Sequence, residues 1–145
     1  MEIVGPRGHR VKAALLLLLA GCFWRTYGSL AATHTDLLVA MARKGTDLVA
    51  SGRFGAENMP ELTYPLERAD AFAHTARARA GDPPPASLLA FEELLIRYRM
   101  FVDALDQTRR AAKGDEARAA LAAPLAAVEA SAAAARAALT AERRG

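Results

Sequence analysis

The chain has 145 residues, with 19 basic and 16 acidic side chains, a formal net charge of +3 and a single cysteine. Residues 1–21 contain three of the basic residues and one acidic residue, so the chain from Cys22 onward has 16 basic and 15 acidic side chains. This near balance gives no reason to expect nucleic acid as a partner. One cysteine excludes an intrachain disulfide, so the 124 residues from Cys22 must be stabilised by packing and are enough for one domain.

The first element in the chain is a short hydrophobic segment that follows three basic residues. Five leucines occupy positions 15–19, and the segment ends in Leu19-Ala20-Gly21-Cys22. A basic start, a short apolar core and small residues before a cleavage site are typical of a secretory signal. Only about twelve residues separate Ala13 from Arg25, whereas a transmembrane helix needs about twenty. The segment therefore predicts export rather than a membrane-spanning helix.

The last four residues of this segment resemble the lipobox of bacterial lipoproteins. The resemblance implies that residues 1–21 are a signal peptide that is removed, and that Cys22 is acylated and holds the protein on a membrane through its lipid. In Gram-negative lipoproteins an Asp after the acylated cysteine favours the inner membrane, and here that residue is Phe23. For a Gram-negative source, the resemblance therefore implies an outer-membrane lipoprotein that faces the periplasm. It covers residues 1–22 only.

Residues 22–29 are expected to form a lipidated tether between the anchor and the first helix. Its extended length is at most about 25 Å, so the domain should lie close to the membrane. Trp24 and Tyr27 either settle among lipid headgroups or pack on that helix. Ser29 is a candidate N-cap, and the helix is expected to end near Gly52. A three-four spacing predicts a buried stripe in which a glycine allows another helix to approach closely: Leu30, His34, Leu37, Met41, Gly45 and Leu48.

Three more helices are expected after this first one. Asn58 precedes the start of the second, and the sequence from Gly81 to Pro85 ends it, because proline lacks a backbone donor and restricts the residue before it. The third runs from about Ser87 to Ala112, and the fourth from Asp115 to about Arg143. The expected core positions are Leu62, Leu66, Ala69, Ala73 and Ala76; then Leu88, Phe91, Leu94, Leu95, Tyr98, Phe101, Val102 and Leu105; and finally Leu121, Leu125, Val128, Ala132, Ala135 and Leu139.

Helices of similar length with short connectors predict an all-α fold for residues 30–145. The expected arrangement is an antiparallel up-down four-helix bundle. The alanine-rich stripe of the last helix is shallow, which leaves a three-helix core with a loosely docked fourth helix as the alternative. In the bundle, the connector from 81 to 85 and the end of the last helix lie near the membrane, and the connectors near residues 52–58 and 114 form the far tip.

The far tip is the predicted partner-binding surface. Its residues Arg53, Phe54, Met59 and Tyr64 differ from the surrounding alanine and arginine background, and arginine, tyrosine and bulky apolar side chains dominate protein interfaces. The alternative is that Phe54, Met59 and Tyr64 only close the open end of the bundle.

The sequence predicts no metal site, no cofactor and no enzymatic activity. His34 and His74 are expected to face different directions, and His74 to pair with Asp70 one turn away. Haem-attachment, zinc-protease, phosphate-loop and nucleophile-elbow motifs are all absent from the sequence.

The function expected from these features is that of a membrane-anchored, non-catalytic adaptor or assembly factor for another envelope protein. The alternative is a carrier of a small ligand or lipid, which would use a bundle interior lined by Phe91, Tyr98 and Phe101. An apolar cavity among these rings would favour the carrier, and a filled core the adaptor.

Overall fold

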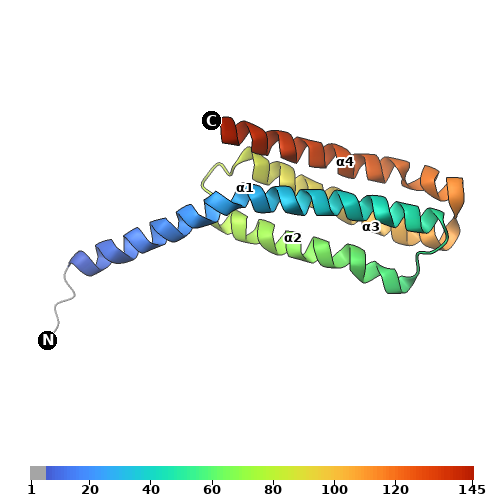
Figure 1. The fold of residues 1–145 in the computed structure, drawn as a ribbon, viewed down its shortest axis with the longest axis horizontal. Coiled ribbons are helices and arrows are strands. Elements are labelled where there is room, and N and C mark those ends of the chain that lie inside the picture. Colours follow the sequence, from blue (N-terminus) through green and yellow to red (C-terminus); the bar gives the residue numbers. More distant parts are fainter. Residues whose placement is uncertain (1–5) are drawn as a thin grey trace.

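The computed structural model describes the backbone of residues 6–145 and the side chains of residues 22–145. It contains four α-helices, α1 (Pro6–Ala50), α2 (Met59–Arg79), α3 (Ala86–Ala111) and α4 (Gly114–Arg144), with the short 3-10 helix η1 (Ala56–Asn58) before α2. The helices run alternately up and down and lie side by side (Figure 1). The predicted all-α four-helix bundle is confirmed.

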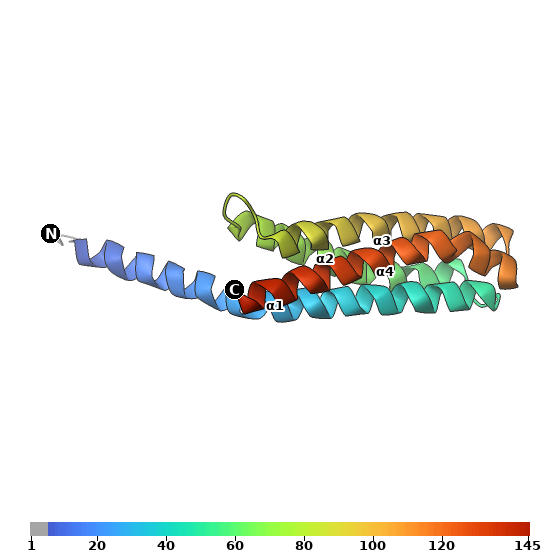
Figure 2. The ribbon, with the colours of Figure 1, turned by 90° about the horizontal axis from the view of Figure 1, so that it is seen from above.

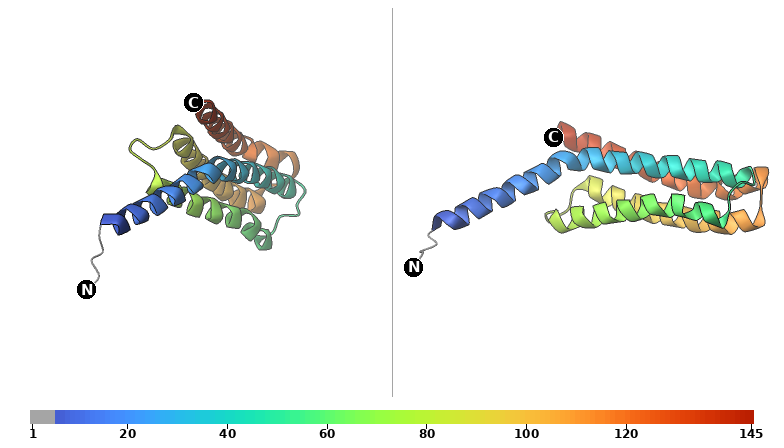
Figure 3. Two further views of the ribbon diagram at one scale, coloured as in Figure 1. Left: turned by 60° about the vertical axis from the view of Figure 1, so that its left-hand side comes forward. Right: turned by 60° about the horizontal axis from the view of Figure 1, so that its bottom comes forward.

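The two ends of the bundle differ in what they contain. The connector between α2 and α3 and the last turn of α4 lie beside the middle of α1, and we call this the proximal end (Figures 1 and 2). The α1–α2 and α3–α4 connectors meet at the opposite end, the distal tip (Figure 3). The first part of α1 continues past the proximal end, beyond the other three helices. The antiparallel order therefore separates a proximal end near Cys22 from a distal tip.

The helix α1 is longer at its start than predicted. The expected tether, residues 22–29, belongs to α1, and Ser29 lies inside this helix instead of capping it. Of the expected signal peptide, residues 6–21 form the first part of α1, and residues 1–5 lie outside the described residues. Between Cys22 and Ser29 the residue that disfavours a helix most is Gly28, which costs about 1 kcal/mol relative to alanine. Packing of this segment on α2 and α3 offsets such a cost.

The buried face of α1 is also rotated from the predicted one. Leu30 and Leu37 are 43% and 41% exposed, and His34 and Met41 are only partly buried. Gly45 is the one predicted position that is fully buried, and Leu48 is partly buried. The other residues that face the core follow the same spacing one position later: Ala31, Thr35, Leu38, Ala42, Thr46 and Val49. One position is about 100° of helix rotation. The prediction that Gly45 allows a close approach is confirmed, because a Cβ there would lie 2.8 Å from Leu105 Cδ1 and 3.3 Å from Leu62 Cδ2.

The cores of α2, α3 and α4 agree with the predicted stripes. Every expected core residue of α2 and α3 is buried, and in α4 only Leu125 is partly exposed. Tyr98 in the centre of the core has a hydrogen-bond partner for its buried hydroxyl, which donates to the Leu62 carbonyl at 2.8 Å. Because Leu121 and Val128 of α4 belong to the main core cluster, α4 is a full member of the bundle. The alternative of a three-helix core is therefore wrong.

Three exposed ion pairs follow the line of contact between α1 and α4, which we call the α1–α4 seam. Charge alternates in sign along each helix of the seam and is opposite across it. The pairs and their N–O distances are Asp36–Arg136 at 2.7 Å, Arg43–Glu129 at 3.4 Å and Asp47–Arg118 at 2.8 Å. Side chains this exposed contribute at most about 1 kcal/mol per pair.

Candidate functional site

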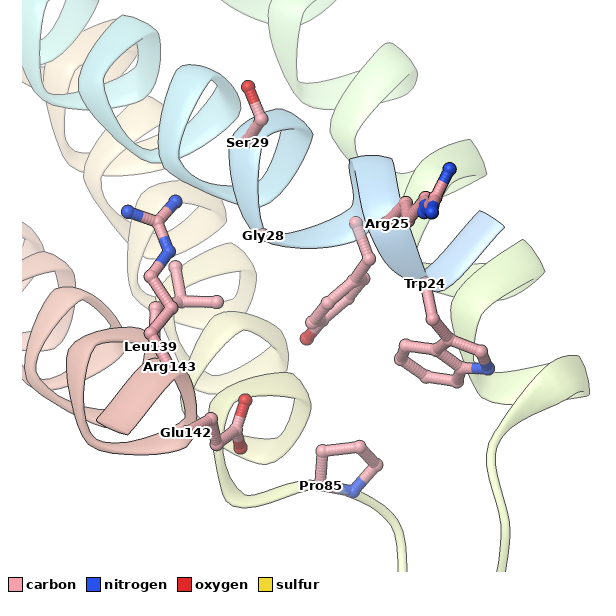
Figure 4. A pocket seen from close by; sticks show the side chains of 9 residues that line it. Trp24, Arg25, Gly28, Ser29, Pro85, Leu139, Glu142 and Arg143 are labelled. Carbon is pink, nitrogen blue, oxygen red and sulfur yellow. The ribbon is translucent and has the colours of Figure 1, made fainter. Parts of the chain in front are cut away.

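A surface pocket lies at the proximal end, where α1 emerges from the bundle. It has a volume of about 550 Å³ and is open to solvent (Figure 4). Its walls come from α1, from the end of the α2–α3 connector and from the last turns of α4. We call it the proximal pocket, and its lining residues are Trp24, Arg25, Tyr27, Gly28, Ser29, Pro85, Leu139, Glu142 and Arg143.

One side of the proximal pocket is fixed by a carboxylate that caps a neighbouring helix. The residue before α3, Pro85, makes no side-chain cap. Instead, Glu142 of α4 accepts the Ser87 backbone N–H at 2.9 Å and the Ser87 hydroxyl at 2.6 Å. A carboxylate at a helix N-terminus satisfies free backbone donors and interacts favourably with the helix dipole. The last turn of α4 is thereby connected to the first turn of α3.

Tyr27 extends this hydrogen-bonded network to α1. Its hydroxyl lies 3.0 Å from Ser87 Oγ, and because the single Ser87 hydroxyl proton is donated to Glu142, Tyr27 is the donor. Burial raises the pKa of the Tyr27 phenol above its ordinary value. Tyr27 is only 4% exposed. Of the two interpretations for this residue, packing on the helices is therefore confirmed.

An aromatic cluster supports the pocket from inside. The Tyr27 ring stacks on Phe72 of α2 with centroids 5.7 Å apart, and Trp24 meets Tyr27 edge-on at 4.9 Å. Phe72 also contacts His34 and Phe91, with ring centroids 5.1 Å and 5.6 Å away. Aromatic pairs of this kind add about 0.5–1.5 kcal/mol beyond the area they bury. The cluster therefore makes the segment just after Cys22 a rigid part of the bundle.

Burial of His34 in this cluster has a measurable consequence. Burial lowers the His34 pKa below its ordinary value of 6.5, and nearby Arg68 lowers it further. The unfolded chain therefore binds the proton first as the pH falls. We expect the Tm to decrease below about pH 6.5 and the effect to be complete below the folded-state pKa. His34→Gln should reduce this pH dependence, measured by thermal melts between pH 7 and 5.

The exposed His74 provides the matched control for this experiment. His74→Gln should keep the pH dependence of the parent protein. An unchanged slope in His34→Gln would contradict the assignment of the effect to His34.

Two arginine side chains lie against α1 at the proximal end. The Arg79 guanidinium lies over the Phe23 ring, with Cζ 4.7 Å from its centroid. Arg143 lies along Gly28, since a Cβ on that glycine would be 3.6 Å from Arg143 Nη2. Figure 4 shows this guanidinium at the α1 side of the pocket, beside Gly28 and Ser29.

The predicted partner-binding residues lie at or near the distal tip but do not form a single exposed cluster. Arg53 is exposed in the connector, where its Nε donates to Ser51 Oγ. Tyr64 is 57% exposed on α2 and accepts a hydrogen bond from Arg68. Phe54 and Met59 are partly buried against the main core cluster. Two of the four predicted residues are therefore exposed, and the other two pack against the core.

The predicted surface pair of His74 and Asp70 does not form. Asp70 forms an ion pair with Arg99 of α3 and does not bind His74 as predicted. Among the residues with described side chains, no group of three or more His, Cys, Asp or Glu residues is placed to bind a metal ion. Among the helices that the structure describes, none is both long enough and apolar enough to cross a membrane.

The proximal pocket was not predicted as a site, because its walls come from three separate parts of the chain. The only sequence signals were the aromatic residues after Cys22 and the pair Arg143-Arg144, which suits a helix C-terminus or contact with anionic lipid. The role of Glu142 as a cap for α3 has no local sequence signature, since capping motifs join residues three positions apart.

Comparison with protein families, curated proteins and solved structures gives no match for this chain.

Proposed function

We propose that this protein is a lipid-anchored envelope lipoprotein whose helical bundle acts as a non-catalytic adaptor or assembly factor for another envelope protein. In a Gram-negative source the lipid on Cys22 would be held in the outer membrane, with the bundle in the periplasm. The sequence Leu19-Ala20-Gly21-Cys22 is the basis for the anchor. The partner would bind at the distal tip.

The observation that carries this proposal is the position of Cys22. It is exposed at the proximal end, five residues before the buried Tyr27, and this separation is about 7.5 Å along a helix. A lipid there would hold the bundle directly against the bilayer. The 26 residues of α3 correspond to about 40 Å, so the distal tip would be the part farthest from the membrane and most accessible to a partner.

The packed interior favours the adaptor over the carrier. The three rings that would line a ligand cavity, Phe91, Tyr98 and Phe101, are each at most 1% exposed and belong to the main core cluster. The proximal pocket is at the surface and contains none of them.

The proposal is tested by recovery of a partner from native membranes. The double variant Arg53→Ala with Tyr64→Ala removes only exposed side chains, so the thermal melt should stay within about 0.5 kcal/mol of the parent. Crosslinking and pull-down of the lipoprotein should then recover clearly less of the partner, because interface hot spots are stabilised by the partner's surface. Phe54 is left intact because it packs on the core.

A matched control is available on the surface of α3, beside α4. Arg97→Ala with Met100→Ala also removes an exposed arginine and a large exposed side chain. This variant should keep the partner. If the control lost the partner and the Arg53/Tyr64 variant kept it, the distal tip would not be the binding surface. If both variants recovered the partner fully, neither surface would bind it.

A further inference from the structure

Charge is distributed unequally between the two ends of the bundle. The proximal segments 22–29, 75–90 and 137–145 contain five arginines and two acidic side chains, whereas the distal segments 45–64 and 106–118 contain five basic and six acidic residues. The excess of positive charge is therefore confined to the end that carries Cys22. Its arginines are Arg25, Arg77, Arg79, Arg143 and Arg144.

The acidic residue inside the proximal pocket forms its hydrogen bonds within the bundle and pairs with none of these arginines. Both carboxylate oxygens of Glu142 are bonded to Ser87 at the start of α3, where the helix dipole also stabilises them. Among side chains in the described part of the chain, Arg79, Arg143 and Arg144 form no ion pair. These three guanidinium groups are therefore available to an external anion.

The pocket also presents the apolar and amphipathic groups that a lipid headgroup region accepts. Trp24 and Pro85 form one side and Leu139 the opposite side, while Arg143 lies at the α1 side (Figure 4). Tryptophan settles at the level of lipid headgroups, with its ring toward the acyl chains. Arginine binds a phosphate through two parallel hydrogen bonds.

We propose that the proximal end docks on an anionic phospholipid surface, with one headgroup phosphate bound by Arg143 in the proximal pocket and with Arg79 and Arg144 adding attraction to neighbouring headgroups. The inference rests on the proposed lipoprotein only for the orientation of the bundle. The expected acyl group on Cys22 would bring this same end to the bilayer, so the docking surface is continuous with the anchor.

The test uses residues 22–145 with Cys22→Ser, so that no lipid contributes to binding. This segment contains all residues of both core clusters, and circular dichroism verifies that it is folded. We expect it to bind vesicles of phosphatidylcholine with phosphatidylglycerol, to bind vesicles of phosphatidylcholine alone much less, and to be released by salt. Each arginine near an anionic surface adds to the attraction, so Arg79→Gln, Arg143→Gln and Arg144→Gln together should weaken binding at least about tenfold.

A control with the same loss of charge is provided by the distal tip. Arg53→Gln, Arg110→Gln and Lys113→Gln remove three exposed positive charges, and binding to the anionic vesicles should change less than about threefold. An equal loss of binding in both triple variants would overturn the proposal, since it would mean that only net charge matters. Equal binding to both kinds of vesicle would also overturn it.

Two single changes test the pocket itself. Arg143 lines the proximal pocket and Arg144 does not, so Arg143→Gln should weaken vesicle binding more than Arg144→Gln. Equal effects would overturn the pocket as the headgroup site. Trp24, the only tryptophan, gives a second measurement: brominated phosphatidylglycerol should quench its fluorescence, and Arg143→Gln should reduce the quenching. If the native protein carried no acyl group on Cys22, the lipoprotein proposal would be wrong. The vesicle results would be unaffected, because the protein used in them has no lipid.

Discussion

Replacing Cys22 by serine is expected to abolish acylation and to release the protein from the membrane fraction. The lipid must be attached to a thiol, and Cys22 is the only cysteine in the chain. The measurement is incorporation of a labelled fatty acid, together with fractionation in high salt and carbonate, which remove proteins held by charge alone.

Thr26→Ala, one helical turn farther along, is the control for this experiment. Thr26 is exposed and bonds only to backbone carbonyls of its own helix, so the variant should keep both the label and the membrane location. If Cys22→Ser stays on the membrane after carbonate, or if the parent takes up no label, the lipoprotein proposal is wrong.

The second large effect is expected in the centre of α3. Leu95 is 3% and Val102 7% exposed, and both face the main core cluster. Leu95→Ala should lower the free energy of unfolding by about 2–5 kcal/mol, through lost apolar contacts and the cavity that remains. Val102→Asp should be at least as damaging, because it buries a carboxylate without a partner. Small domains have only about 5–15 kcal/mol in total.

Neighbouring exposed positions control for the chemistry of these changes. Ile96 is 48% exposed and Gln107 is also exposed, so Ile96→Ala and Gln107→Asp should each shift the free energy of unfolding by less than about 1 kcal/mol. Denaturant and thermal melts of residues 22–145 measure all four variants. Similar melts for Leu95→Ala and Ile96→Ala would mean that the α3 stripe is not central to the core.

The success and failure of the sequence predictions have one physical origin, the size of the buried side chains. In α3 the core is made of large residues such as Phe91, Leu95 and Tyr98, so hydrophobic periodicity identifies the buried face directly. The helices α2 and α3 approach α1 closely at Gly45, and the core face of α1 consists largely of small residues such as Ala42 and Gly45. The larger Leu30 and Leu37 remain on the partly exposed side, which shifted the predicted face by one position.

The candidate site depended on information that no local pattern contains. Cys22 could be proposed as a lipidation site from four consecutive residues, whereas the proximal pocket requires Tyr27, Ser87 and Glu142 to meet across 115 positions of sequence. The extension of α1 through residues 22–29 could have been predicted from the lack of a strong helix breaker there. The aromatic packing that stabilises this extension could not, because Phe72 belongs to another helix.

The alternating charges of the α1–α4 seam restrict how these two helices can align. A slip of α4 by one heptad relative to α1 would bring Asp36 opposite Glu129 in one direction, or Arg43 opposite Arg136 in the other. Small alanine side chains interlock less than large ones, so the alanine-rich stripe of α4 distinguishes these alignments less sharply than a stripe of large residues would. Although exposed ion pairs add little to stability, like charges in the slipped alignments repel, and the seam thus selects one register for the helix with the shallowest apolar face.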